Sequence, residues 1–299
     1  MKKFFALSIL LLTLFNVQSA GAELTRLTDK VYAYVGVKDA SAAHSFAANA
    51  GIVIGRDGVL VIDTLISARE GERFLADIRA VTDKPIKYVI NTHTHLDHAL
   101  GNCVFAKLGA VVISHEADQA MLATRGADIL KNAGTYGLKP EDMLGTEIVV
   151  PTLAFSNQMT IDLGGEQVRL LRTLPSHTAG SLVVHLPAEK LLFSGDILFT
   201  DFHPFMGDGD LEGWSKTLDS LQAMEIDNIV PGHGPLSTKK DLRDMQEYLS
   251  LFDKKARELA GTMQDANAIA ARLLEILPKR SMADWMVAYN VKSRYLGKK

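Results

Sequence analysis

The chain has 299 residues, of which 47% are hydrophobic and 22% charged, which suits one large globular domain with or without a small appendage. Its formal charge of −3 and the lack of a long basic run argue against nucleic acid as a substrate, because nucleic-acid binding depends on clustered Lys and Arg. The single cysteine, Cys103, excludes an internal disulfide, and its apolar neighbours indicate a small core residue.

The first 22 residues have the layout of a secretory signal peptide. Lys2 and Lys3 give a positive start, an apolar stretch spans Phe4–Phe15, and the small residues Ala20 and Ala22 predict cleavage after Ala22. This stretch is shorter than the ~20 residues that a bilayer span needs, which disfavours a membrane anchor. We therefore expect an exported protein with no membrane span in its mature form, periplasmic if the source is Gram-negative. Loss of the two lysines would change the formal charge from −3 to −5 (−3 − 2).

Strand and helix patterns follow one another through the first half of the mature chain. The turn residues Gly55–Gly58 indicate a hairpin, and Ser67 is a plausible helix cap. An irregular excursion is predicted over Thr124–Leu144. The predicted strands are Val31–Val35, Gly51–Ile54, Val59–Asp63, Lys87–Asn91 and Ala110–Ile113, and the predicted helices are Ser67–Ala80, Ala99–Leu108 and Ala117–Ala123.

The second half repeats this order, with one helix predicted over Leu211–Met224 and mostly helical sequence from Thr238 onward. Strand runs in both halves, each followed by helices, favour an α/β sandwich with sheets inside and helices outside. The predicted strands of this half are Met159–Leu163, Gln167–Thr173, Ser181–Pro187, Lys190–Ser194 and Asn228–Val230.

The densest group of chemically active side chains directly follows a predicted strand. His93, His95, Asp97 and His98 fall within six residues. On an extended segment alternate side chains share a face, so His93 and His95 can point at one metal ion. If the chain then turns into a helix, the side chains of Asp97 and His98 point towards a second metal position next to the first. Because neutral imidazole and carboxylate are standard zinc ligands, the pattern predicts metal binding rather than a His-rich surface loop.

Three further ligand candidates lie far away in the sequence. His177, Asp196 and His233 each follow an apolar run and are flanked by small or turn-forming residues. Such positions at strand ends are where a rigid scaffold displays functional groups. His203, seven residues after Asp196, is a candidate substrate contact, and a turn histidine before Pro204 is the equal alternative.

Together these residues resemble the five motifs of the metallo-β-lactamase superfamily in order, spacing and local context. The motif residues are Asp63, the H-x-H-x-D-H run of 93–98, His177, Asp196 and His233. The resemblance implies a four-layer αβ/βα sandwich with the metals at the sheet ends. It also implies that residues 23–240 form a metallo-β-lactamase-like domain, with 241–299 as a helical C-terminal segment packed on it.

The same resemblance implies the division of the ligands between two metal ions. His93, His95 and His177 would hold one, Asp97, His98 and His233 the other, and Asp196 would bridge the two. Asp63 would orient the site from outside the coordination sphere, and a cap for the following helix is its alternative role.

The predicted function is that of a dizinc hydrolase. A metal-bridging hydroxide would cleave an ester, thioester or lactone, a small-molecule substrate, in the cell envelope, with Asp97 or Asp196 moving the proton. Asp196 replaces the Cys or Ser typical of antibiotic-degrading members and is similar to the aspartate of hydroxyacylglutathione hydrolases and lactonases. A β-lactamase and a non-catalytic metal- or cofactor-binding accessory protein remain alternatives. Iron or manganese in place of zinc and the oligomeric state also stay open.

Overall fold

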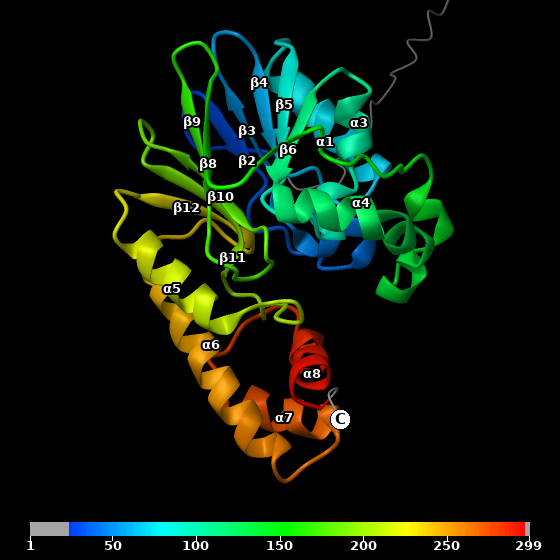
Figure 1. Cartoon of the computed structure of the whole chain (residues 1–299), viewed down its shortest axis with the longest axis vertical. Helices are drawn as coiled ribbons and strands as arrows, with labels where there is room; N and C mark the ends of the chain where they lie inside the picture. Colours follow the sequence, from blue (N-terminus) through cyan, green and yellow to red (C-terminus); the bar gives the residue numbers. More distant parts are fainter. Residues whose placement is uncertain (1–23, 297–299) are drawn as a thin grey trace, which may run out of the picture.

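The computed structural model describes residues 24–296, and the predicted signal peptide therefore lies outside the described residues. Two β-sheets pack face to face, with helices α1 and α3 on the outer side of one sheet and α5 and α6 on the outer side of the other (Figure 1). The four-layer αβ/βα sandwich predicted from the sequence is confirmed.

The first sheet has seven strands in sequence order, antiparallel from β1 to β4 and parallel from β4 to β7. Alternate residues of its strands bury opposite faces: Val59 and Val61 contact the outer helices, whereas Leu60 and Ile62 pack between the sheets. The strands are β1 (Thr25–Arg26), β2 (Val31–Ala33), β3 (Gly51–Ile54), β4 (Val59–Ile62), β5 (Ile86–Ile90), β6 (Val111–His115) and β7 (Leu153–Phe155).

The helices associated with this sheet are α1 (Ala68–Val81), α2 (Leu96–Ala99), α3 (Asn102–Ala106) and α4 (Glu116–Lys131). Ser67 caps α1 as predicted, because its side chain accepts a hydrogen bond from the Glu70 amide. The single helix predicted over Ala99–Leu108 is instead divided at Gly101, where an added Cβ would lie 1.9 Å from the Thr64 carbonyl oxygen. After His95 the chain turns into a short helix, α2.

The irregular excursion predicted over Thr124–Leu144 is wrong in its first part, because α4 continues to Lys131. Gly126 suggests a break, but it lies inside the helix where Ile148 packs so closely that an added Cβ would be 2.7 Å away. Short turns of 3₁₀-helix follow at η2 (Ala133–Tyr136) and η3 (Pro140–Met143). A further 3₁₀ segment, η1 (Ala42–Ala47), precedes β3.

The second sheet has five strands in the order β12-β11-β10-β9-β8, with β11 and β12 parallel and the other pairs antiparallel. Its outer face is covered by α5 (Leu211–Gln222) and α6 (Lys239–Ala260). The strands are β8 (Gln158–Asp162), β9 (Gln167–Arg172), β10 (Leu182–Leu186), β11 (Leu191–Phe199) and β12 (Asn228–His233).

The C-terminal helices belong to the same hydrophobic core as this sheet. Helix α6 extends past the sheet, and α7 (Ala266–Ile276) and α8 (Trp285–Val291) pack at its far end, followed by a π-helical turn at η4 (Lys292–Leu296) (Figure 1). Phe199 of β11, Tyr248 of α6 and Val287 of α8 are members of one buried cluster. Over residues 24–296 no helix has the length and apolar character needed to cross a membrane.

Candidate metal centre

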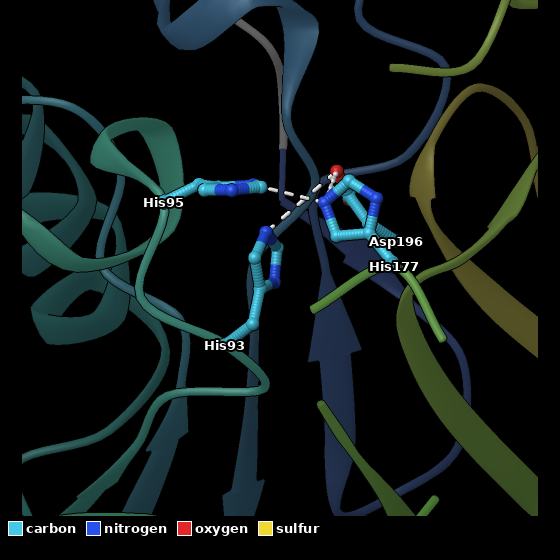
Figure 2. Close-up of side chains that lie close together, drawn as sticks. All are labelled: His93, His95, His177 and Asp196. Atoms are coloured by element: carbon cyan, nitrogen blue, oxygen red, sulfur yellow. Dashed lines mark hydrogen bonds and ion pairs between the residues drawn. The ribbon is translucent and has the colours of Figure 1, made fainter. Parts of the chain in front are cut away.

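Four of the predicted ligands converge from three separate segments. His93 and His95 follow β5, His177 lies between β9 and β10, and Asp196 lies in β11. Figure 2 shows their side chains pointing toward one another. The Nε2 atom of His177 lies 2.9 Å from Nδ1 of His95 and 3.2 Å from Oδ2 of Asp196. Nε2 of His93 lies 3.7 Å from the same carboxylate oxygen.

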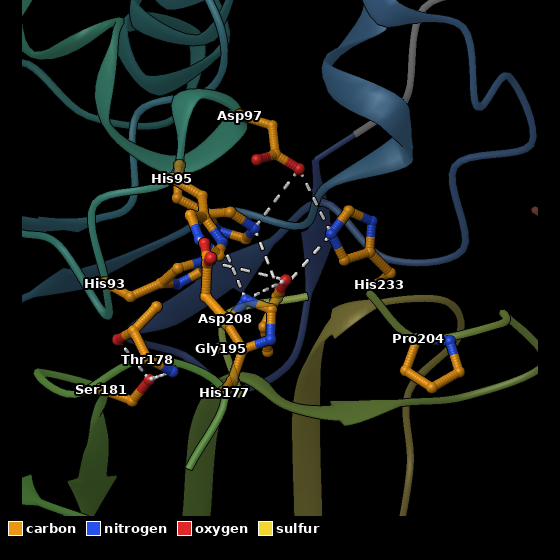
Figure 3. A network of polar contacts seen from close by, with 12 residues as sticks. His93, His95, Asp97, His177, Thr178, Ser181, Gly195, Pro204, Asp208 and His233 are labelled. Atoms are coloured by element: carbon orange, nitrogen blue, oxygen red, sulfur yellow. Dashed lines mark hydrogen bonds and ion pairs between the residues drawn. The ribbon is translucent and has the colours of Figure 1, made fainter. Parts of the chain in front are cut away.

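A second group forms next to the first. Asp97 and His98 of α2 face His233 at the end of β12, with Asp97 Oδ2 lying 3.7 Å from His98 Nε2 and 3.4 Å from His233 Nε2. The other oxygen of Asp196, Oδ1, lies 3.1 Å from His98 Nε2 and 3.5 Å from His233 Nε2. One carboxylate oxygen of Asp196 therefore faces each group, and Figure 3 shows the contacts of this network.

The donor atoms of the two groups fit divalent metal ions. In each group the candidate ligand atoms lie within 4.8 Å of one another. Nε2 of His93, Nε2 of His98 and Oδ1 of Asp196 are buried without a hydrogen-bond partner, which is costly unless a cation is there to satisfy them. A set rich in imidazole nitrogen with added carboxylates suits zinc.

The protonation states agree with metal binding. Burial lowers the pKa of His177 to about 3 and that of His93 well below its ordinary value, so both rings are neutral and offer a lone pair. Burial also opposes a charge on His233, but the Asp196 and Asp97 carboxylates outweigh it and raise the pKa to about 9. The carboxylates thus require a positive charge, which a bound metal ion would provide in place of a proton.

The orientation of His98 is fixed by Asp63. Oδ1 of Asp63 accepts a hydrogen bond from the Thr92 amide at 2.8 Å, and Oδ2 accepts one from the Thr92 hydroxyl at 2.7 Å. Oδ2 also lies 2.9 Å from His98 Nδ1, which assigns the ring proton to Nδ1 and leaves the Nε2 lone pair facing the centre. The alternative role of Asp63 as a helix cap is filled by Ser67.

Two glycines allow the strands to approach the centre. Strand β11 does not end at Ser194 as predicted but continues to Phe199, with register shifts around Gly195. Gly195 has φ +50°, and an added Cβ would lie 2.5 Å from the Thr92 hydroxyl. Gly232, before His233, leaves even less room, because a Cβ there would lie 1.9 Å from Asp196 Oδ1. The register shifts of β11 around Gly195 form a bulge, and this bulge turns the Asp196 carboxylate towards the metal centre.

Two aspartates that sequence reasoning missed support the histidines. Asp118 in the first turn of α4 accepts hydrogen bonds from the Thr94 amide at 2.9 Å and the Thr178 hydroxyl at 3.3 Å, which joins the loops that carry His95 and His177. Asp208 Oδ2 lies 3.1 Å from His95 Nε2, and this hydrogen bond lowers the pKa of Asp208. The acidic loop after Asp196 was a signal for Asp208, but nothing in the sequence marked Asp118.

The structure does not bring His203 into either group. Its Nδ1 lies 2.6 Å from the Tyr248 hydroxyl of α6, and its Nε2 lies 3.3 Å from Asp284 Oδ1. The ring is buried under the C-terminal helices with 2% exposure. Both ring nitrogens are thus engaged in holding these helices, and this placement gives no support to the predicted substrate contact.

Comparisons with known proteins agree with this geometry. Residues 45–233, more than half of the chain, match the family model of the metallo-beta-lactamase superfamily. The chain is 28% identical to the metallo-beta-lactamase type 2 of Bacteroides fragilis over 71% of its own length and 78% of that protein. It is 27% identical to the linear primary-alkylsulfatase of a Pseudomonas species over 63% of its length, but spans less than half, 42%, of that larger protein.

Two solved structures show the same fold. A metallo-beta-lactamase from Pontibacter korlensis has a TM-score of 0.63 at 24% identity, covering 76% of this chain and 98% of its own. A stereoselective inverting sec-alkylsulfatase from Pseudomonas has a TM-score of 0.67 at 19% identity, covering 93% of this chain and 51% of its own. At these identities the likeness concerns the fold alone.

Proposed function

Because this chain belongs to the metallo-beta-lactamase superfamily, whose members are mostly metal-dependent hydrolases, we propose a specific hydrolytic role for it. It is an exported dizinc hydrolase that cleaves an ester, thioester or lactone in the cell envelope. The export part of the proposal rests on the sequence pattern of residues 1–22.

The observation that carries the proposal is the placement of Asp196. Its Oδ2 faces His93 and His177, and its Oδ1 faces His98 and His233. A carboxylate placed in this way would be able to hold two cations at once, whereas a single structural zinc site is closed by four ligands of its own. The arrangement therefore supports a catalytic pair of ions more than a structural site.

The residues of the chain have separable roles in such a reaction. A pair of zinc ions, when bound, would supply a water of lowered pKa and a Lewis acid for the substrate oxygen. Asp63, Asp118 and Asp208 hold the ligand side chains or their loops, so that no reorganisation is needed during the reaction. Asp97 retains 12% side-chain exposure, against 4% for Asp196, and is therefore the better placed of the two carboxylates to pass a proton to the leaving group.

The test is a hydrolysis screen with metal-quantified protein. Wild-type protein with two zinc ions per chain should hydrolyse members of a panel of neutral esters, thioesters and lactones, and Asp196→Asn should not. Asp83→Asn, at an exposed surface position, is the matched control. Full zinc loading without turnover of any substrate in the panel would overturn the proposal.

A β-lactamase is the second candidate, favoured by the similarity to the Bacteroides fragilis enzyme over most of that protein. One feature weighs against it: Asp196 stands where antibiotic-degrading members of the superfamily typically have Cys or Ser. Turnover of nitrocefin and a carbapenem by the zinc-loaded protein decides between the two candidates. An alkyl sulfate belongs in the same screen because of the alkylsulfatase relative.

A further inference from the structure

Solvent reaches chiefly two of the seven candidate ligands of the metal centre. His95 and Asp97 keep 18% and 12% side-chain exposure, while the other five keep 4% or less. A substrate therefore has to arrive where His95 and Asp97 face solvent. The residues around this opening decide what kind of substrate is accepted.

Four aromatic side chains from three segments lie in two contacting pairs beside the ligand groups, and we call them the aromatic rim. The Phe205 ring lies 5.4 Å from the His95 ring and 6.0 Å from the His177 ring, and the Tyr289 ring of α8 lies 5.4 Å from Phe205. The members of the rim are Phe46 of η1, Phe205 of the loop after β11, and Trp285 and Tyr289 of α8.

The rim continues to the side of the second ligand group. The Trp285 ring lies 6.1 Å from the Phe46 ring, and the backbone oxygen of Phe46 lies 3.0 Å from His233 Nδ1. The aromatic side chains of α8 thus contact Phe46 and Phe205, and each of these two residues lies next to one ligand group.

These rings are exposed at a cost. Trp285 and Tyr289 retain 50% and 45% of their surface, although aromatic side chains gain most from burial. Clustered exposed aromatic surface next to a polar centre is typical of a ligand-binding site rather than of an ordinary protein surface.

The rim is also held rigidly by the C-terminal segment. Buried Asn290 of α8 accepts a hydrogen bond from the Met206 amide at 2.8 Å and donates one to the Pro204 carbonyl at 2.7 Å. Arg294 donates to the carbonyls of Met206 and Gly209 at 2.6 and 2.7 Å. These bonds fix the loop that carries Phe205 and Asp208, and a preorganised wall binds at a lower entropic cost.

The side chains in contact with the aromatic rim add no positive charge. Within the described part of the chain, no Lys or Arg forms a hydrogen bond, ion pair or cation–π contact with the rim residues. Asp208, 64% exposed, adds a carboxylate, and Arg125 affects its pKa without a hydrogen bond to it. A substrate with a carboxylate or sulfate group has no cationic partner on this wall.

We propose that α8 and the loop after β11 form the binding wall for the apolar part of the substrate, and that this substrate is a neutral ester, thioester or lactone with an alkyl chain or aryl group. The inference rests on the proposed hydrolase function and assigns Trp285 and Tyr289 to substrate selection. Binding energy from this remote part of the substrate is available to position the scissile carbonyl at the opening.

The kinetic test uses zinc-loaded protein and p-nitrophenyl esters from acetate to octanoate. In the wild type kcat/KM should rise roughly twofold per methylene, about half of the effect of full burial. Trp285→Ala and Tyr289→Ala should lower kcat/KM for the octanoate roughly tenfold and change that for the acetate less than twofold. Ile276→Ala, a similarly exposed position on α7, is the control and should follow the wild type at every chain length.

A binding test separates this inference from the proposed hydrolysis. Octanamide and octyl sulfate are titrated into the zinc-loaded protein by calorimetry, with acetamide as the short analogue. Octanamide should bind at least tenfold more tightly than acetamide and octyl sulfate, and Trp285→Ala should remove the preference over acetamide. Equal binding of octanamide to wild type and Trp285→Ala would overturn the inference even if esters are hydrolysed. Selective octanamide binding without turnover would retain the apolar wall and reject the hydrolase proposal alone.

Discussion

The Nδ1 atom of His98 lies 2.9 Å from Oδ2 of Asp63, and the same carboxylate accepts both the amide and the hydroxyl of Thr92. An Asn side chain at position 63 has one acceptor and one donor end, so it cannot reproduce all three contacts. If its NH₂ group faces His98, the ring proton moves to Nε2 and the ligand atom is lost.

We therefore expect Asp63→Asn to weaken the metal site of Asp97, His98 and His233. Asp63 has φ +57°, a conformation that Asn tolerates, so the backbone should be retained. The affinity of this site for zinc should fall roughly 10- to 100-fold, measured by competition with a chromogenic chelator. Asp83→Asn serves as the surface control, and unchanged affinity for both ions in Asp63→Asn would contradict the orienting role.

Removing the shared carboxylate should affect both ions together. Asp196→Ala deletes the oxygen that faces each group, and the zinc content measured by mass spectrometry should fall from two per chain to below one. His177→Ala, which removes a ligand candidate of one group only, should lose one ion and retain the other. Loss of a single ion from Asp196→Ala would show that Asp196 serves one group and not both.

The hydrogen bonds between Asn290 of α8 and the loop after β11 lead to a prediction about stability. Asn290→Ala leaves the Met206 amide and the Pro204 carbonyl without partners in a buried place, where each unsatisfied group costs about 1–3 kcal/mol. The free energy of unfolding in urea should fall by roughly 2–4 kcal/mol. Ser293→Ala, one turn along the same segment, should change it by less than about 0.5 kcal/mol. Equal stability of the two variants would argue against a stabilising role for the Asn290 hydrogen bonds.

Buried His203 predicts a pH dependence of stability. Burial lowers its pKa from 6.5 to about 4, so the folded ring stays neutral where the unfolded ring is already protonated. Above pH 6.5 both states are neutral and the contribution is nil; as the pH falls from 6.5 towards 4, the unfolded state takes up a proton and stability is lost. The loss is on the order of 2–3 kcal/mol.

The variant His203→Gln lacks this titration and isolates its effect. The free energy of unfolding of metal-free protein is measured at pH 7.5 and at pH 4.5. Its decrease between these two pH values should be smaller for His203→Gln than for the wild type by the loss given above. Identical drops in the two proteins would place the pKa of folded His203 near its ordinary value.

Much of the centre was predictable because its residues follow strands in a dense, ordered pattern. The run from His93 to His98, together with His177, Asp196 and His233, predicted two groups that the structure does bring together. Each of these residues can be recognised from its own segment alone, because it is a typical metal ligand that lies next to turn-forming residues. The fold followed from the alternation of strands and helices.

What could not be predicted depends on partners distant in the sequence. Asp118 looks like an ordinary charged residue at a helix start, and its role arises only because the Thr178 loop packs on it. His203 looked like a substrate contact because it lies near Asp196 in sequence, but Tyr248, 45 residues later, holds it elsewhere. Gly126 suggested a loop because the close packing of Ile148 is invisible in the local sequence.

The contact between Gly232 and the Asp196 carboxylate makes these two positions interdependent. A Cβ at residue 232 would lie 1.9 Å from Asp196 Oδ1, so any larger residue there must displace the carboxylate. A side chain at 232 would thus disturb the carboxylate oxygen that faces His98 and His233. The Gly195 carbonyl carbon and the Asp196 backbone nitrogen would also lie only 2.7 and 2.8 Å from that Cβ, so a shorter side chain at 196 would not make room for a methyl group, and any redesign of the metal pair has to keep glycine at 232.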